Sequence, residues 1–227
     1  MKANLEILFE DDSLIVINKQ RGLAVQTVKA YEKDAVSILK EHIKSNSSEI
    51  KGEPYVGVVH RLDQPVSGIV VFAKNSKAAA KLSEQIREKV FNKHYYALVE
   101  GILPPVTCKE LKSYIGKDPH SGLATVRNNM TGKPGNSGIS YKEAILSYSV
   151  VSSDDSSNTT KVDILLTTGR FHQIRAQFSE IGHPIVGDRK YGSVGGFSGG
   201  IALMAYKLSF VHPTSGKTME FVTECDF

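Results

Sequence analysis

Asp63 is the first residue in this sequence whose type and position could support chemistry. It lies in the polar segment HRLDQPVSG (60–68), within four positions of His60 and next but one to Arg61, between two apolar runs that resemble buried strands. Carboxylates are rarely buried unless they are paired or functional. An Asx turn or a structural ion pair would also explain an aspartate in such a connection, and both are common.

A cation that could pair with Asp63 is found on a helix predicted after Gly169. At about 100° per residue, the apolar stripe of this helix contains Phe171, Ile174, Phe178 and Ile181. Arg175 falls at the edge of the stripe, beside His172 on the polar side. An isolated helical arginine more often extends into solvent. An arginine beside Asp63 would instead keep that carboxylate ionised at neutral pH, as a nucleophile requires.

A tyrosine on a predicted strand is the third candidate. In the aromatic-rich run 94–99, side-chain alternation places Tyr95 on one face with Lys93, Ala97 and Val99, and Tyr96 on the other face. Core packing is the usual role of an aromatic residue in a strand. A tyrosine that projects into a cleft could instead stack on a nucleobase, which is worth about 1–3 kcal/mol.

The elements that must position these residues are predicted from the periodicity of the apolar residues. Strands are expected at 5–9, 14–17, 55–59, 69–73 and 94–99. Helices are expected at 34–45, at 77–90 and after Gly169, with Gly182 as a left-handed cap of the last one. Since strands outnumber helices, we expect an α+β fold with a mixed sheet. We expect one catalytic domain, residues 1–227, with two lobes.

The composition excludes several classes of protein. Of the 227 residues, 41% are hydrophobic and 23% are charged, which is ordinary for a globular domain. No apolar run approaches the roughly 18 residues of a membrane span, and the acidic opening segment does not resemble a signal peptide, so we expect a cytoplasmic protein. Cys108 and Cys225 are too few and too far apart to predict a metal site. The net charge of +4 permits a polyanionic partner.

Three segments together resemble a known family. HRLDQPVSGIVVFAK (60–74), KHYYALVEG (93–101) and TTGRFHQIRAQFSEIGHPIVGDRKYG (167–192) are similar to the signature segments of RluA-type pseudouridine synthases. The opening and closing segments at 8–26 and 208–217 resemble that family too. The matches occur in order over nearly the whole chain, and they begin within the first ten residues, so we expect no N-terminal S4 module.

The resemblance implies a fold, a reaction and a set of site residues. The fold is a long mixed, mostly antiparallel β-sheet with flanking helices and a central RNA-binding cleft. The implied catalytic residues are Asp63, Tyr95 and Arg175. The implied RNA-binding or base-binding residues are His60, Arg61, His172 and Ile174. Arg61 would take the place of an everted nucleotide, and Ile174 would line the base pocket.

The implied activity is the isomerisation of uridine to pseudouridine in structured ribosomal RNA, transfer RNA or both. The enzyme cuts the bond between the ribose and uracil N1, turns the base and rejoins the sugar at C5, so no cofactor or metal is expected. Asp63 could act as nucleophile, electrostatic partner or base. We expect a monomer whose partner is RNA. A non-catalytic RNA-binding or ribosome-assembly factor of the same fold and a base glycosylase are the alternatives.

Three positions depart from the pattern of the family. Gln20 replaces a proline that usually follows Asn-Lys, Gln64 replaces an arginine, and Met204 replaces a histidine. None of them is a predicted catalytic residue, so the departures concern RNA contacts and the choice of target.

Overall fold

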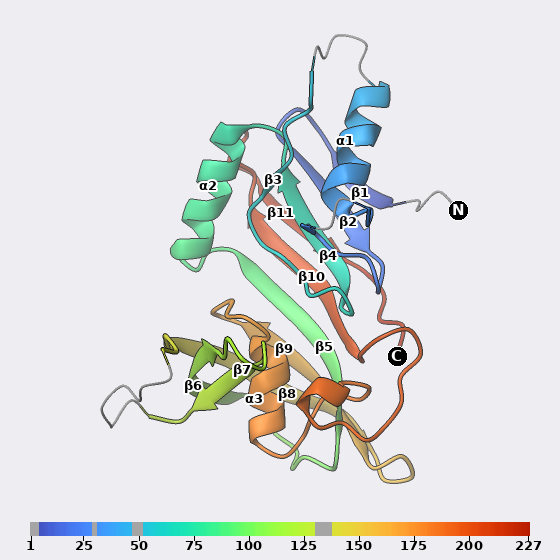
Figure 1. Cartoon of the computed structure of the whole chain (residues 1–227), viewed down its shortest axis with the longest axis vertical. Coiled ribbons are helices and arrows are strands. Elements are labelled where there is room, and N and C mark those ends of the chain that lie inside the picture. The colour runs from blue at the N-terminus through green and yellow to red at the C-terminus, as the bar shows by residue number, and fades with distance from the viewer. Residues whose placement is uncertain (1–4, 29–30, 47–51, 130–137) are drawn as a thin grey trace. The chain divides into compact units, whose positions relative to one another are not determined.

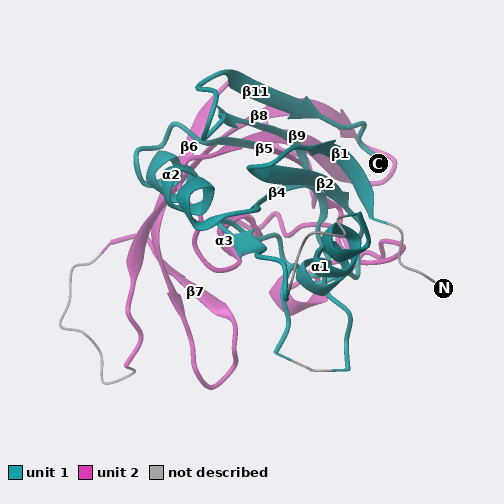
Figure 2. Ribbon diagram, turned by 90° about the horizontal axis from the view of Figure 1, so that it is seen from above, with its two compact units in different colours: residues 1–93, 204–226 teal, residues 94–203, 227 magenta. Residues whose placement is uncertain are grey.

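Strands outnumber helices in the computed structural model, which describes residues 5–28, 31–46, 52–129 and 138–227. The chain divides into two compact units (Figure 2). Unit 1 contains Met1–Lys93 and Met204–Asp226, and unit 2 contains His94–Leu203 and Phe227. The predicted α+β class and the mostly antiparallel strand pairing are confirmed.

Unit 1 is built on a mixed sheet flanked by two helices (Figure 1). Its elements are β1 (Glu6–Glu10), β2 (Leu14–Lys19), α1 (Ala35–Asn46), β3 (Gly57–Val58), β4 (Ser67–Ala73), α2 (Ser76–Arg87), β10 (Leu203–Val211) and β11 (Thr218–Val222). The strand order is β1-β2-β4-β10, with β11 paired to β10 and β3 paired to β4. The β4–β10 pair is parallel, whereas β1–β2, β2–β4, β3–β4 and β10–β11 are antiparallel.

The core of unit 1 lies between α2 and the sheet. Ala78 and Leu82 of α2 pack against apolar residues of β2, β4 and β10, including Leu14, Val71 and Phe210. Strand β4 is buried along its whole length, which agrees with the continuous apolar run in its sequence. Asn75 caps α2: its side-chain oxygen accepts a hydrogen bond of 2.9 Å from the backbone N–H of Ala78.

Unit 2 contains an antiparallel sheet and one α-helix. Its elements are β5 (Asn92–Glu100), β6 (Lys109–Lys117), β7 (Ala124–Arg127), β8 (Lys142–Asp154), β9 (Thr159–Leu166), α3 (Gln173–Glu180) and a 3₁₀ turn η1 (Arg189–Tyr191). The strand order is β5-β9-β8-β6-β7. Ala176 of α3 packs with Ile115, Ala124 and Ala144 of β6, β7 and β8.

The end of α3 follows the sequence prediction, and its apolar stripe follows it only in part. Gly182 is left-handed, with φ of +81°, and the N–H of His183 donates to the carbonyl of Phe178 in the bond that closes a Schellman motif. Phe178 is buried as predicted, but Ile181 is 38% exposed. Ile181 is the C-cap residue, so its side chain no longer follows the helical repeat. In the part of the chain that is described, no helix is long and apolar enough to cross a membrane.

Candidate active site

Asp63 lies in unit 1, in the connection between β3 and β4. A turn closes just after it, because the N–H of Val66 donates to the carbonyl of Asp63 over 3.0 Å. Asp63 is partly exposed, Leu62 beside it is buried, and Arg61 is exposed. Leu62 therefore anchors the segment to the core while its two charged neighbours remain accessible.

Lys19, at the end of β2, attaches the Asp63 loop to its surroundings. Its side chain is completely buried, and its ammonium donates to the carbonyls of Gln20, Leu23 and Gln64 over 3.1, 2.9 and 3.4 Å. Burial lowers the pKa of Lys19 to about 8, and the nearby negative charge of Asp63 acts in the opposite direction. Lys19 therefore connects two loops and places a positive charge near Asp63.

Gln64 strengthens the same connection. Its side-chain amide donates to the carbonyl of Gly22 over 3.0 Å, and the N–H of Gly22 donates to the Gln64 carbonyl over 2.9 Å. This pair of hydrogen bonds closes the loop after β2 onto the loop before β4. Gln64, which replaces the arginine of the family pattern, thus makes a structural contact within unit 1.

His60 holds the other end of the segment. Its Nε2 accepts a hydrogen bond of 3.1 Å from the backbone N–H of Val71 in β4, and its ring packs edge-on against Phe91 with centroids 5.2 Å apart. Burial, together with the charge of Lys93, lowers the pKa of His60 to about 3, so the ring is neutral with its proton on Nδ1. This packing gives His60 a structural contact; its predicted contact with RNA remains a prediction.

The start of β4 approaches β10 very closely. Gly68 has a φ of +118°, and a Cβ at this position would lie 2.2 Å from the carbonyl oxygen of Ala205. Only glycine fits there. Met204 is buried and pairs with Ser67 in the parallel ladder, so the third departure from the family pattern is a core residue of unit 1.

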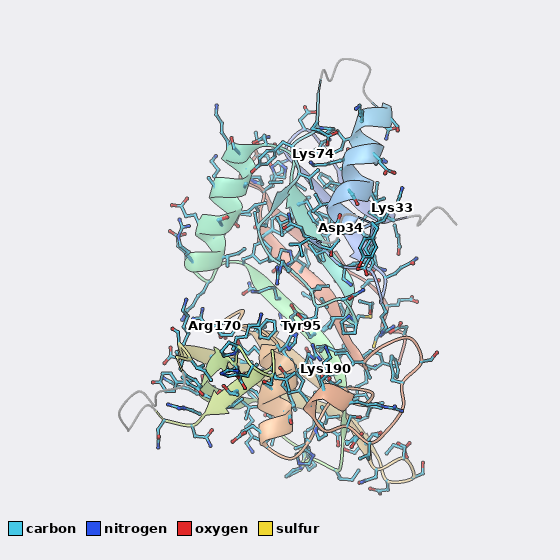
Figure 3. The ribbon with its side chains drawn as sticks, in the orientation of Figure 1. Lys33, Asp34, Lys74, Tyr95, Arg170 and Lys190 are labelled. Atoms are coloured by element: carbon cyan, nitrogen blue, oxygen red, sulfur yellow. The ribbon has the colours of Figure 1, made fainter. Side chains whose placement is uncertain are left out.

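Tyr95 lies in unit 2, on β5 (Figure 3). Burial alternates along this strand as predicted, with Lys93, Tyr95 and Ala97 buried on one face. Tyr95 is 5% exposed. The predicted face is confirmed, and the proposed stacking of Tyr95 on a base remains a prediction.

Arg175 is buried in unit 2 rather than extended into solvent. Its Nε and Nη2 donate to the two carboxylate oxygens of Asp188 over 2.6 and 2.9 Å, and both side chains are at least 96% buried, with exposures of 4% and 2%. A bidentate pair of this kind fixes the plane of the guanidinium. Sequence reasoning missed Asp188, although the GDRKYG part of the third signature segment contains it.

Tyr191, in the 3₁₀ turn η1, connects Arg175 to His172. The Arg175 guanidinium carbon lies 4.9 Å from the centre of the Tyr191 ring. The tyrosine hydroxyl is 2.8 Å from His172 Nδ1 and accepts a hydrogen bond of 2.8 Å from the N–H of Ala124. His172 is left-handed, with φ of +51°, and stacks on Phe171 at a centroid distance of 3.8 Å. His172 and Arg175 are thus both held by contacts with the same ring.

The predicted site residues are divided between the two units. His60, Arg61 and Asp63 belong to unit 1, whereas Tyr95 and Arg175, with His172 and the buried Ile174, belong to unit 2. The pairing of Asp63 with Arg175 therefore remains a prediction. Within the described ranges, no group of three or more His, Cys, Asp or Glu side chains could hold a metal ion.

Comparisons with known proteins agree on one family. The model of the family described as RNA pseudouridylate synthase matches residues 13–180. Ribosomal large subunit pseudouridine synthase D of Neisseria meningitidis is 33% identical over 229 residues, which cover 96% of this chain and 57% of that protein. The dual-specificity RNA pseudouridine synthase RluA of Vibrio vulnificus is 34% identical over 225 residues, which cover 98% of this chain and 84% of that protein. The chain thus spans little more than half the length of the meningococcal relative.

Solved structures share the fold. Human RNA Pseudouridylate Synthase Domain Containing 4 superposes with a TM-score of 0.75 at 22% identity, covering 97% of this chain and 88% of that one. Human RNA Pseudouridylate Synthase Domain Containing 1 gives a TM-score of 0.73 at 24% identity, covering 97% and 83%. The predicted pseudouridine synthase fold is therefore confirmed.

Proposed function

Because the chain belongs to the RNA pseudouridylate synthase family, we propose that it isomerises uridine to pseudouridine in RNA. The observation that carries the proposal is that the family match over residues 13–180 includes Asp63, Tyr95 and Arg175. The reaction breaks the bond from ribose to uracil N1 and forms a bond from ribose to C5, while C5 loses its proton and N1 gains one. The chain must therefore act on the sugar, hold the detached base and let it turn.

Asp63 is the proposed reacting carboxylate. Its loop is fixed at one end by His60 and at the other by Lys19 and Gln64, and a carboxylate held in this way is positioned before the substrate arrives. The negative charge of Asp63 favours the charged form of the buried Lys19 beside it. An ionised Asp63 suits each of its possible roles, as nucleophile, as electrostatic partner and as base.

Arg175 and Tyr95 are the proposed partners of Asp63. The bidentate pair with Asp188 uses Nε and Nη2 of Arg175 and fixes the plane of its guanidinium. Arg175 would orient the aspartate, and the ring of Tyr95 would stack on the target uracil. Arg61, which is exposed, would fill the space left by the everted nucleotide.

Ribosomal and transfer RNA are the proposed substrates. One relative is named for the large ribosomal subunit and another for dual specificity, and transfer RNA is proposed from the family resemblance alone. We propose that the enzyme works as a monomer in the cytoplasm. Mapping pseudouridines by carbodiimide adducts and primer extension, in cells with and without the gene, identifies the target. An unchanged map, with no conversion of RNA by the purified protein, would contradict the proposed function.

The Asp63→Asn variant tests the role of the carboxylate. It keeps the size and hydrogen-bonding capacity of the side chain but removes its charge, so pseudouridine formation should fall by about a thousandfold or more. RNA binding and the fold should persist. Asp155→Asn, in the exposed turn between β8 and β9, is the matched control and should keep full activity. Near-normal turnover by Asp63→Asn would show that another group reacts with the nucleotide, and release of free uracil would indicate a glycosylase.

A further inference from the structure

Lys93, at the start of β5, is a buried cation with no counter-charge. The residue is 8% exposed. Among the residues that the structure describes, no carboxylate pairs with its ammonium and no acceptor forms a hydrogen bond with it. Burial lowers the pKa of Lys93, and no neighbouring anion offsets that effect. An isolated buried charge is costly and is rarely retained without a partner.

Lys19, also buried in unit 1, is an example of an ammonium whose hydrogen-bond donors all have partners. Lys19 donates to three backbone carbonyls and lies near the charge of Asp63. An ammonium has three donors, so Lys19 is saturated by the protein. Lys93 is comparably buried and has none of these contacts, so the structural role of Lys19 does not extend to it.

The surroundings of Lys93 contain a second hydrogen-bond donor, His60. The positive charge of Lys93 is close enough to lower the pKa of His60. Since His60 Nε2 accepts the N–H of Val71, its Nδ1 carries the proton, and this atom is sealed from solvent without a partner in the described structure. Two neighbouring groups therefore offer protons, and what this place lacks is an anion.

The Nζ atom of Lys93 is not completely sealed, although the residue as a whole is buried. Its Nζ is not among the unpartnered polar atoms that are sealed from solvent, whereas Nδ1 of His60 is. Lysine commonly buries its alkyl chain in this way and keeps its charged end accessible. An anion from solution could therefore contact Lys93 directly, near the neutral His60 ring.

We propose that Lys93 binds a backbone phosphate of the RNA, at or next to the nucleotide that reacts. This inference rests on the proposed function, because RNA is the anion that such an enzyme meets. Lys93 and Tyr95 project from the same face of one continuous strand, about 7 Å apart along it. The phosphates of a nucleotide stacked on Tyr95 would thus lie within reach of Lys93, two residues earlier in the same strand. Lys93 would fix the register of the RNA on the protein without reading the RNA sequence.

The test compares Lys93→Met with Lys77→Met, a control that removes the same charge from the exposed first turn of α2. The affinity of each protein for an RNA stem-loop is measured over a series of KCl concentrations. Loss of one phosphate contact should reduce the slope of log K against log[KCl] by about 0.7–0.9, with about tenfold weaker binding at low salt. Lys77→Met should keep the wild-type slope. Equal slopes and affinities for Lys93→Met and wild type would overturn the proposal.

The stability of the same variant separates ligand binding from a structural role. Methionine fills a similar volume and removes an unpaired buried charge, so the unfolding midpoint of Lys93→Met should not fall. A lysine with a structural task would instead lose both stability and binding when replaced. Lys93→Arg should restore the salt slope, because it supplies the charge again. A weaker-binding Lys93→Met that is also clearly less stable, without rescue by arginine, would assign Lys93 to the scaffold.

The proposal can also be tested on the wild-type protein, so that the test does not depend on the folding of a variant. Acetylation of lysines, followed by peptide mass spectrometry, should show that the stem-loop protects Lys93 far more than Lys77. Equal protection of the two lysines would contradict the proposal. The salt slope and the acetylation pattern measure binding and the unfolding midpoint measures stability, so they remain decisive even for an RNA in which no pseudouridine forms. A failure of the proposed catalysis is therefore distinguishable from a failure of the phosphate contact.

Discussion

The ion pair between Arg175 and Asp188 makes a strong quantitative prediction. Asp188→Asn leaves a side chain of the same shape that can accept only one of the two hydrogen bonds, and it removes the charge that compensates Arg175. Both side chains are almost fully buried, at 4% and 2% exposure. Breaking a buried pair by removing one partner usually costs about 3–5 kcal/mol, because the other charge stays buried and uncompensated. We expect the free energy of unfolding to fall by about 3 kcal/mol.

A second arginine–aspartate pair in the same chain provides the control. Arg21 binds both carboxylate oxygens of Asp226, but the side chains are 13% and 50% exposed. Solvent screens a pair of this kind, so Asp226→Asn should cost less than about 1 kcal/mol. The two substitutions are chemically identical and differ mainly in burial.

Urea denaturation followed by circular dichroism measures both effects. For a slope of about 2 kcal/mol per molar urea, Asp188→Asn should lower the midpoint by about 1.5 M and Asp226→Asn by less than about 0.5 M. Pseudouridine formation by Asp188→Asn should also fall in native buffer, since the plane of the Arg175 guanidinium is no longer fixed. If Asp188→Asn costs no more stability than Asp226→Asn, the buried pair does not hold Arg175 in place and the reasoning fails.

Two further predictions concern unit 1. The pKa of Lys19 is lowered from 10.5 to about 8, so the unfolded chain binds a proton that the folded chain does not between these pH values. Stability should therefore rise with pH in this window by up to about 3 kcal/mol relative to Lys19→Met; a flat difference from pH 8 to 10.5 would show that Lys19 is not desolvated. Arg61→Ala should impair pseudouridine formation more on a folded stem-loop than on a flexible single strand of the same sequence, because eversion from a stack costs a few kcal/mol. An equal defect on the two RNAs would instead indicate phosphate binding by Arg61.

Local patterns in the sequence predicted much of the fold. The helices expected at 34–45 and 77–90 are found at Ala35–Asn46 and Ser76–Arg87. The alternation in β5 correctly separated the face of Tyr95 from that of Tyr96. The strand expected at 55–59 shrinks to Gly57–Val58. An apolar run shows that a segment is buried, but not whether a neighbouring strand pairs with its whole length.

The contacts that position the candidate site were less predictable, because they depend on atoms without a sequence signature. Helical geometry placed Arg175 at the edge of an apolar stripe and the family resemblance implied its role, but its partner Asp188 lies in an irregular segment where no periodicity applies. Lys19 was one of many basic residues in the sequence. Its acceptors are backbone carbonyls, which every residue type supplies.

The same dependence on backbone atoms explains why the departures at Gln20 and Gln64 leave the Asp63 loop intact. Lys19 binds the carbonyl oxygens of both residues, and Gly22 donates to the carbonyl of Gln64. These acceptors remain when the side chains change, since a proline at position 20 or an arginine at position 64 would present the same carbonyls. The residue at position 19 cannot change in the same way, because the side chain of Lys19 is the donor that connects the two loops. The side chains of positions 20 and 64, both exposed, can therefore change the proposed RNA contacts while the position of Asp63 within unit 1 is preserved.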